Sequence, residues 1–158
     1  MIKAALTLAC LPLAACAAGG TQTATAAPAA GPGSQQIVAA RQAAFGLTAS
    51  TFGALRGAVE GGGDLKPVAG GARNIARWAD AIPGMFPEGT QLPTSKAKAE
   101  IWQNRAGFEA RAAALATAAR ALADAAESGD RAALGTRLGA VGQACGACHQ
   151  AYRVETAS

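Results

Sequence analysis

Two segments in the first half of the chain place apolar residues at alternating steps of three and four, which keeps one face of a helix toward a core. The first is predicted to begin at Ser34, a suitable helix cap, and to end at glycines 61–63. Its apolar positions are Val38, Phe45, Phe52, Leu55 and Val59. The second ends at Pro83-Gly84, and its apolar positions are Leu65, Val68, Ala72, Ile75, Ala79 and Ile82.

Two further segments in the second half follow the same spacing. The third is predicted to begin near Thr94 or Ser95, after a connection that prolines keep out of any helix, and to end at Ser128-Gly129. Its apolar positions are Ile101, Phe108, Ala112, Leu115, Ala119, Leu122 and Ala126. The fourth is predicted to start with Asp130 as its cap. Its apolar positions are Leu134, Leu138, Val141, Cys145, Cys148 and Tyr152.

Four amphipathic helices, three of them joined by short turns, predict an all-α, antiparallel, up-and-down four-helix bundle. A two-stranded coiled coil is disfavoured, because Gly and Pro interrupt the pattern three times and the e and g positions lack regular charge pairing. The 158 residues suit one domain, and the apolar fraction of 51% is supplied largely by Ala, with only 4% aromatic residues. This composition favours helices packed closely through small side chains.

The N-terminus has the layout of a bacterial export signal, because Lys3 precedes an apolar run from Ala4 to Leu13 that is too short to span a bilayer. Leu13-Ala14-Ala15-Cys16 resembles a lipobox, at which the signal is cut so that Cys16 carries lipid. The alternative is an ordinary signal cut further on, for instance after residues 24–26, with Cys16 discarded. Either reading predicts a periplasmic protein, and the lipobox adds a membrane anchor through Cys16.

The chain is thus divided into a signal at residues 1–15, a tether at 16–33 and the bundle at 34–158. The tether region after its first cysteine contains no charge and no large apolar side chain, so we expect it to be flexible. The net charge of +4 is spread along the chain without a basic block that contains aromatic residues. Nucleic acid is therefore not an expected partner.

Cys145, Cys148 and His149 form the C-x-x-C-H pattern typical of haem c attachment. Two thiols one turn apart can add to the two vinyl groups, while the adjacent imidazole lies under the iron. A zinc site would need further ligands, and apart from Cys16 no other Cys or His remains after export. A thioredoxin-like dithiol belongs in an α/β pattern, and a disulfide between the two cysteines would distort the helix. The pattern predicts one covalent haem c, with His149 as axial ligand.

The opposite face of the iron has few possible ligands in this sequence. His149 is the only histidine, and no methionine follows it. Met85 is the only methionine after the signal, and it lies in a turn where methionine more often fills the end of a bundle. Five-coordinate iron is therefore predicted. The alternative is a low-spin electron carrier with Met85 as sixth ligand.

From Ser34 to the C-terminus these features resemble the cytochromes c′, the class II family of c-type cytochromes. The resemblance is carried by Arg41-Gln42, Phe86 with Glu88-Gly89-Thr90, Glu100-Ile101-Trp102, Val141-Gly142, the haem motif and Tyr152-Arg153. It implies a left-handed four-helix bundle, commonly a homodimer packed through its first helices. It also implies a high-spin haem whose iron binds NO and often CO.

The resemblance also implies roles for residues outside the haem motif. Arg41 and Gln42 would lie near the haem edge and propionates, and Phe45 would cover the distal face of the iron. A buried Arg41 would need an anion, which a propionate supplies. Arg153 would lie beside the proximal pocket, or simply favour the helix C-terminus. Further candidates for the pocket are Thr94, Ser95 and Phe86.

Phe45 belongs to the apolar stripe and offers no hydrogen bond to bound O₂. We therefore expect a haem protein that binds NO and CO slowly or weakly, or passes single electrons to an unidentified redox partner, without turnover. A haem enzyme acting on NO or peroxide is a further alternative, but it calls for a distal acid or base. The only histidine is expected on the proximal side.

Overall fold

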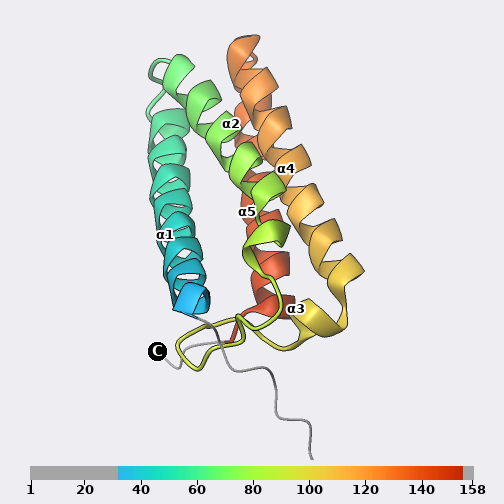
Figure 1. Cartoon of the computed structure of the whole chain (residues 1–158). Coiled ribbons are helices and arrows are strands. Elements are labelled where there is room, and N and C mark those ends of the chain that lie inside the picture. Colours follow the sequence, from blue (N-terminus) through green and yellow to red (C-terminus); the bar gives the residue numbers. More distant parts are fainter. Residues whose placement is uncertain (1–31, 155–158) are drawn as a thin grey trace, which may run out of the picture.

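The computed structural model describes residues 32–154, so the predicted signal, Cys16 and most of the tether lie outside the described residues. Its helices are α1 (Pro32–Glu60), α2 (Lys66–Ala81), the 3₁₀ helix η1 (Pro83–Met85), α3 (Glu100–Gln103), α4 (Arg105–Glu127) and α5 (Arg131–Tyr152). The four long helices run up and down beside one another (Figure 1). The predicted all-α four-helix bundle is confirmed.

The third predicted segment differs from the structure at its start. No helix begins at Thr94 or Ser95. Helix α3 begins at Glu100, and Asn104 interrupts the helix before α4. Asn104 has φ −124° and ψ 63°, and its side chain accepts a hydrogen bond from the Gly107 N–H at 3.1 Å. The residue therefore acts as the cap of α4. The spacing of apolar residues continues across Asn104 without a change, so it does not predict that the helix is interrupted there.

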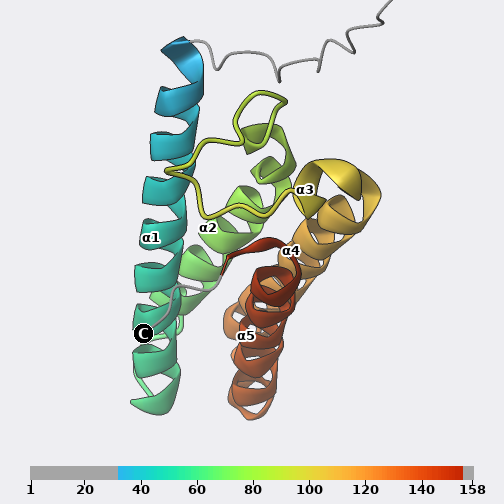
Figure 2. The ribbon, with the colours of Figure 1, turned by 90° about the horizontal axis from the view of Figure 1, so that it is seen from below.

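The chain between Ser95 and α3 pairs with the end of α5 instead of forming a helix. The Lys98 N–H donates to the Tyr152 carbonyl at 3.0 Å, and the Val154 N–H donates to the Lys96 carbonyl at 2.8 Å. The connection after α2 therefore crosses the end of the bundle at which α5 finishes (Figure 2). This is the end that carries the C-x-x-C-H residues.

The predicted ends around the last turn agree with the structure. Helix α4 ends at Glu127, and Gly129 takes a left-handed φ of 74° that suits glycine. Asp130 accepts a hydrogen bond from the Ala133 N–H at 3.1 Å and so caps α5, as predicted. Helix α1 begins at Pro32, two residues before the predicted cap Ser34.

The core is built mainly by α2, α4 and α5. Helix α2 packs most extensively on α4, with Ala72, Ala79 and Ala119 fully buried, and α4 packs in turn on α5. Helix α1 packs on α2 but touches α5 much less, and the two stand apart in Figure 2. The interface between α1 and α5 is thus the least closed side of the bundle. Within residues 32–154, no helix combines the length and apolar character that crossing a bilayer requires.

Candidate functional site

The two thiols of the C-x-x-C-H motif lie on one face of the last turns of α5. Cys145 and Cys148 are half-buried and form no disulfide. Burial raises the pKa of Cys145, and the pKa of Cys148 is raised by burial and by Cys145, against a smaller opposing effect of the Arg111 charge. Both side chains are therefore protonated thiols near neutral pH.

His149 follows the second thiol in the last turn of α5. Its pKa is lowered from the usual value by desolvation and then by the positive charge of Arg153. The neutral imidazole is the form that ligates a metal. The described residues contain no cluster of three or more His, Cys, Asp or Glu side chains that could hold a metal ion. A metal that arrives with its own ligands, as iron does in a porphyrin, needs only His149.

The register between α1 and α5 places Phe45 opposite this histidine. A Cβ built on Gly142 would lie 3.4 Å from Cζ of Phe52, so these two positions face each other. The helices run in opposite directions (Figure 1). Phe45 precedes Phe52 by seven residues and His149 follows Gly142 by seven, which is about 10 Å along each axis. Phe45 is therefore level with His149 across the least closed side of the bundle.

The side chains around this level are apolar and incompletely covered. Phe45, Cys145 and Cys148 pack against the core but are only partly buried. Burying apolar surface of this kind stabilises a bound apolar group. The residues present therefore fit a large, flat, apolar prosthetic group joined to the two thiols.

An aromatic cluster extends from Phe45 into the bundle. The Phe45 ring meets Trp78 edge-on, with centroids 5.3 Å apart and an interplanar angle of 83°, and lies 6.4 Å from Phe86. Phe86 is 5.0 Å from Phe108, which is 5.2 Å from Tyr152 of α5. These spacings are typical of favourable aromatic pairs. The face predicted to be distal is thus backed by packed rings.

Arg41 is buried, but its partners differ from the prediction. Its guanidinium donates to the Met85 carbonyl (3.0 Å), Thr90 Oγ1 (2.9 Å), the Thr90 carbonyl (2.9 Å) and Ser95 Oγ (2.8 Å), and stacks 4.1 Å from the Phe86 ring centroid. Burial lowers the pKa of Arg41 from its usual value. Neutral oxygens satisfy the guanidinium, so the inference that its burial requires an anion is wrong. Contact between Arg41 and a haem propionate stays a prediction from the resemblance.

Gln42 also bonds to the connection between α2 and α3: its Nε2 donates an exposed hydrogen bond to the Thr94 carbonyl at 2.9 Å. The structure thus brings together most of the residues predicted around the pocket: Arg41, Gln42, Phe86, Thr94 and Ser95. Arg153 is exposed, and its N–H donates to the His149 carbonyl at 2.9 Å while its backbone bridges Ala97. Its position fits both a place beside the proximal pocket and the general preference of arginine for a helix C-terminus.

Sequence reasoning missed two residues of this cluster. Thr90 is fully buried, and its hydroxyl also donates to the Pro87 carbonyl at 2.7 Å. Arg105 donates to the Phe86 carbonyl at 3.0 Å and to the Pro83 carbonyl at 2.6 Å, fixing the turn from the side of α4. The bonds of Arg105 end on backbone carbonyls, which every residue has, so no sequence signal could have found them.

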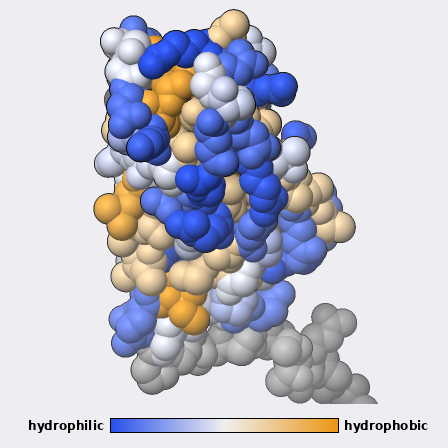
Figure 3. Space-filling model, turned by 90° about the horizontal axis from the view of Figure 1, so that it is seen from above, coloured by the Kyte–Doolittle hydropathy of each residue, from blue (hydrophilic) through white to orange (hydrophobic). Residues whose placement is uncertain are grey.

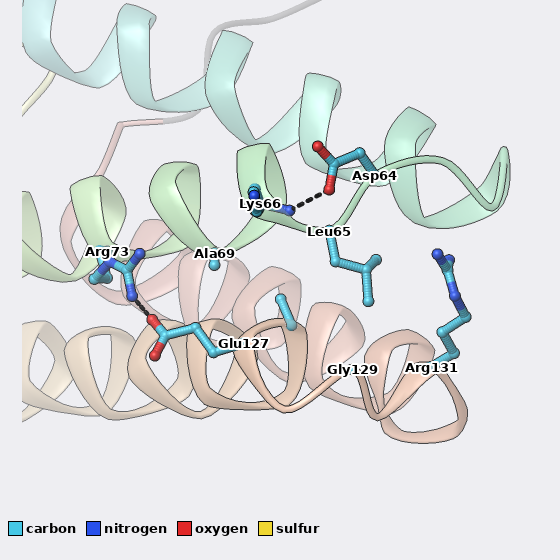
Figure 4. Close-up of a pocket in the computed structure, with 9 residues that line it drawn as sticks. Asp64, Leu65, Lys66, Ala69, Arg73, Glu127, Gly129 and Arg131 are labelled. Atoms are coloured by element: carbon cyan, nitrogen blue, oxygen red, sulfur yellow. Dashed lines mark hydrogen bonds and ion pairs between the residues drawn. The ribbon is translucent and has the colours of Figure 1, made fainter.

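A separate hollow of about 380 Å³ lies at the opposite end of the bundle (Figure 4). Most of its charged side chains have partners: Arg73 pairs with Glu127, Asp64 accepts from the backbone N–H of Lys66, and Arg131 donates to the Gly63 carbonyl. The hollow contains none of the predicted site residues.

On the face shown in Figure 3, hydrophilic residues dominate and the hydrophobic patches are small and separate.

The bundle, the C-x-x-C-H residues and the apolar seam between α1 and α5 define a helical protein of the kind that holds haem c. Residues 36–153 match the model of the cytochrome c′ family, and the chain belongs to this family. The family binds c-type haem.

Two relatives and two solved structures illustrate the similarity. Cytochrome c′ of Pararhodospirillum photometricum is 37% identical over 83 residues, which cover 52% of this chain and 66%, just under two thirds, of that protein. Cytochrome c-556 of Agrobacterium tumefaciens strain B2A is 38% identical over 92 residues, or 58% and 74% of the two chains. Cytochrome c′ from Thermochromatium tepidum superposes with a TM-score of 0.70 at 31% identity, covering 77% of this chain and 97% of that one. A nitric oxide complex of a variant cytochrome c prime from Alcaligenes xylosoxidans gives 0.71 at 30% identity, with 78% and 97% covered.

Proposed function

We propose that this protein is a periplasmic haem c protein with five-coordinate, high-spin iron, which binds NO and CO or transfers single electrons without turning over a substrate. The observation that carries the proposal is the placement of Phe45 level with His149 across the seam between α1 and α5. A phenyl ring cannot ligate iron, so an exogenous gas is the ligand left for the face it covers. The nitric oxide complexes of similar structures support this reading.

The proposed haem is single and covalent, held through Cys145 and Cys148, with His149 as its axial ligand. When bound, this group supplies an iron that takes up a diatomic gas and exchanges one electron. The chain supplies the rest. The thiols fix the group, the neutral imidazole of His149 provides the proximal ligand, and Phe45 keeps water and larger molecules from the other face.

The proposal is tested by the rate at which the ferrous haem protein binds CO. Phe45→Ala removes the ring that covers the distal face, so the association rate measured by stopped flow should rise. Phe52→Ala is the matched control, because it removes a half-buried ring of the same helix two turns away, and its rate should stay near that of the wild type. An unchanged association rate in Phe45→Ala would contradict the proposal.

We propose further that the protein dimerises through α1. Leu47 is 71% exposed on this helix, although it is a large apolar residue. Gly46 and Gly53, seven residues apart on one side of α1 about 100–120° around the helix from Leu47, have open space around their Cβ positions, so a second helix could approach closely. A similar cytochrome c′ structure, with a TM-score of 0.72 at 28% identity over 80% of this chain and 100% of that one, is described as showing ligand-controlled dimer dissociation. Sedimentation of wild type and Leu47→Glu should give a dimer and a monomer; two equal masses would contradict this interface.

Export and lipid attachment are proposed from the N-terminal sequence alone. Intact mass of protein purified from membranes should show a chain that begins at Cys16 and carries lipid, plus one haem. A Cys16→Ser variant should be released into the soluble periplasmic fraction. A mature chain that begins beyond Cys16 would rule out the anchor and leave the haem proposal untouched.

A further inference from the structure

Trp78 of α2 stands out because its indole N–H is buried and has no hydrogen-bond partner among the described residues. The other tryptophan, Trp102, is partly buried, and its Nε1 donates to the Pro87 carbonyl at 3.2 Å. A buried donor without an acceptor is unfavourable. A residue that only filled space between α1 and α2 would not need to carry such a donor, so another feature of the indole must favour it here.

That feature is its contact with Phe45. Trp78 follows Gly71 by seven residues, and a Cβ on Gly71 would lie 2.7 Å from Leu55 Cδ2 of α1, so both positions face α1 where the two helices approach closely. Two turns along this seam, the Trp78 ring meets the Phe45 ring edge-on at 5.3 Å.

The other aromatic neighbour of Phe45 leaves it little freedom. Phe86 is only 5% exposed and is held between Phe108 and Trp102, beneath the guanidinium of Arg41. Trp78 is half-buried at the edge of the core. Two rings therefore flank Phe45: Phe86, which is fixed in the core, and the indole of Trp78 in α2.

We propose that Trp78 is a positioning residue for Phe45, which holds the phenyl ring over the gas-binding face and thereby limits how fast a ligand reaches the iron. This inference rests on the proposed function, in which Phe45 covers that face. The large ring of Trp78 blocks the space into which Phe45 would swing. The unpartnered N–H is the cost of placing the bulkiest side chain there.

The test measures CO association to the ferrous haem protein in Trp78 variants. Trp78→Leu should raise the rate roughly three- to tenfold, the factor that corresponds to losing one edge-to-face aromatic pair. It should also broaden the C–O stretching band, because Phe45 would then occupy several positions. Trp78→Phe keeps an aromatic edge and should stay within about twofold of the wild type. Trp102→Phe is the matched control and should leave both readouts unchanged. If Trp78→Leu does not fold, Trp78→Ile is read in the same way.

A double variant separates the two proposals. Trp78→Leu should add nothing to the rate of Phe45→Ala, because Trp78 acts through the ring that is already absent. If Phe45→Ala speeds binding and Trp78→Leu does not, the role of Trp78 is wrong while the proposed function stands. The same holds if Trp78→Leu gives an equal further gain in the Phe45→Ala background. If Phe45→Ala itself has no effect, the proposed function fails.

Discussion

Replacing Arg41 tests how the connection between α2 and α4 is held at the site. Arg41→Leu removes four hydrogen bonds and leaves the buried Thr90 carbonyl and hydroxyl without their donors. Bonds to a charged group contribute about 1.5–3 kcal/mol each, but these four share one guanidinium and its desolvation, so they do not add. Leaving a buried acceptor without its donor costs about 1–3 kcal/mol, so the Thr90 carbonyl and hydroxyl together should cost about 2–6 kcal/mol. We expect Arg41→Leu to lower the free energy of unfolding by that amount.

The assay is urea unfolding of the haem-loaded protein, followed by far-ultraviolet circular dichroism. Arg41→Lys keeps the charge but cannot reproduce the planar fork, so we expect it to lose at least about 2 kcal/mol of stability. Gln42→Ala is the control, because its single bond to the Thr94 carbonyl is exposed and should contribute less than about 1 kcal/mol. If Arg41→Lys proves as stable as the wild type, the positive charge and not the four hydrogen bonds stabilises the protein, which would refute the claim that these bonds hold the connection in place.

Three further substitutions test local features of the fold by thermal unfolding. Asp130→Ala removes the cap of α5 and should cost about 1 kcal/mol; no loss of stability would show that the bond to the Ala133 N–H is dispensable. Gly107→Ala should cost about 1–3 kcal/mol, because its Cβ would lie 2.6 Å from the Tyr152 hydroxyl, and a neutral result would mean that the two elements are not so close. Gly139→Ala, on an exposed and open face of α5, should instead add about 0.5–1 kcal/mol, and a destabilised protein would contradict the open surface.

The four long helices could be predicted from the sequence because their apolar period continues over many turns. The start of the third could not. Ser95 accepts a hydrogen bond from Arg41, and the segment up to Lys98 pairs with Tyr152, so partners far away in the sequence decide its conformation. The break at Asn104 was hidden for a different reason, since a single capping residue does not disturb the apolar period.

The sequence could single out Cys145, Cys148 and His149 as candidate haem residues because their pattern is local, with three side chains within two turns of one helix. The environment of Arg41 could not, because its acceptors are mostly carbonyl and hydroxyl oxygens of a connection whose path the sequence does not show. Likewise, the sequence does not single out Trp78. Its contact with Phe45 depends on the register between α1 and α2, which a pattern of apolar positions leaves undetermined.

The central claim is that His149 ligates a haem iron whose other face, beneath Phe45, is open to a gas. The most direct test is the absorption spectrum of the purified haem protein in its ferric and ferrous states, with and without CO and NO. We predict high-spin spectra in both oxidation states and new bands on addition of either gas to the ferrous protein. A low-spin spectrum that CO leaves unchanged would contradict the claim and favour Met85 as a sixth ligand.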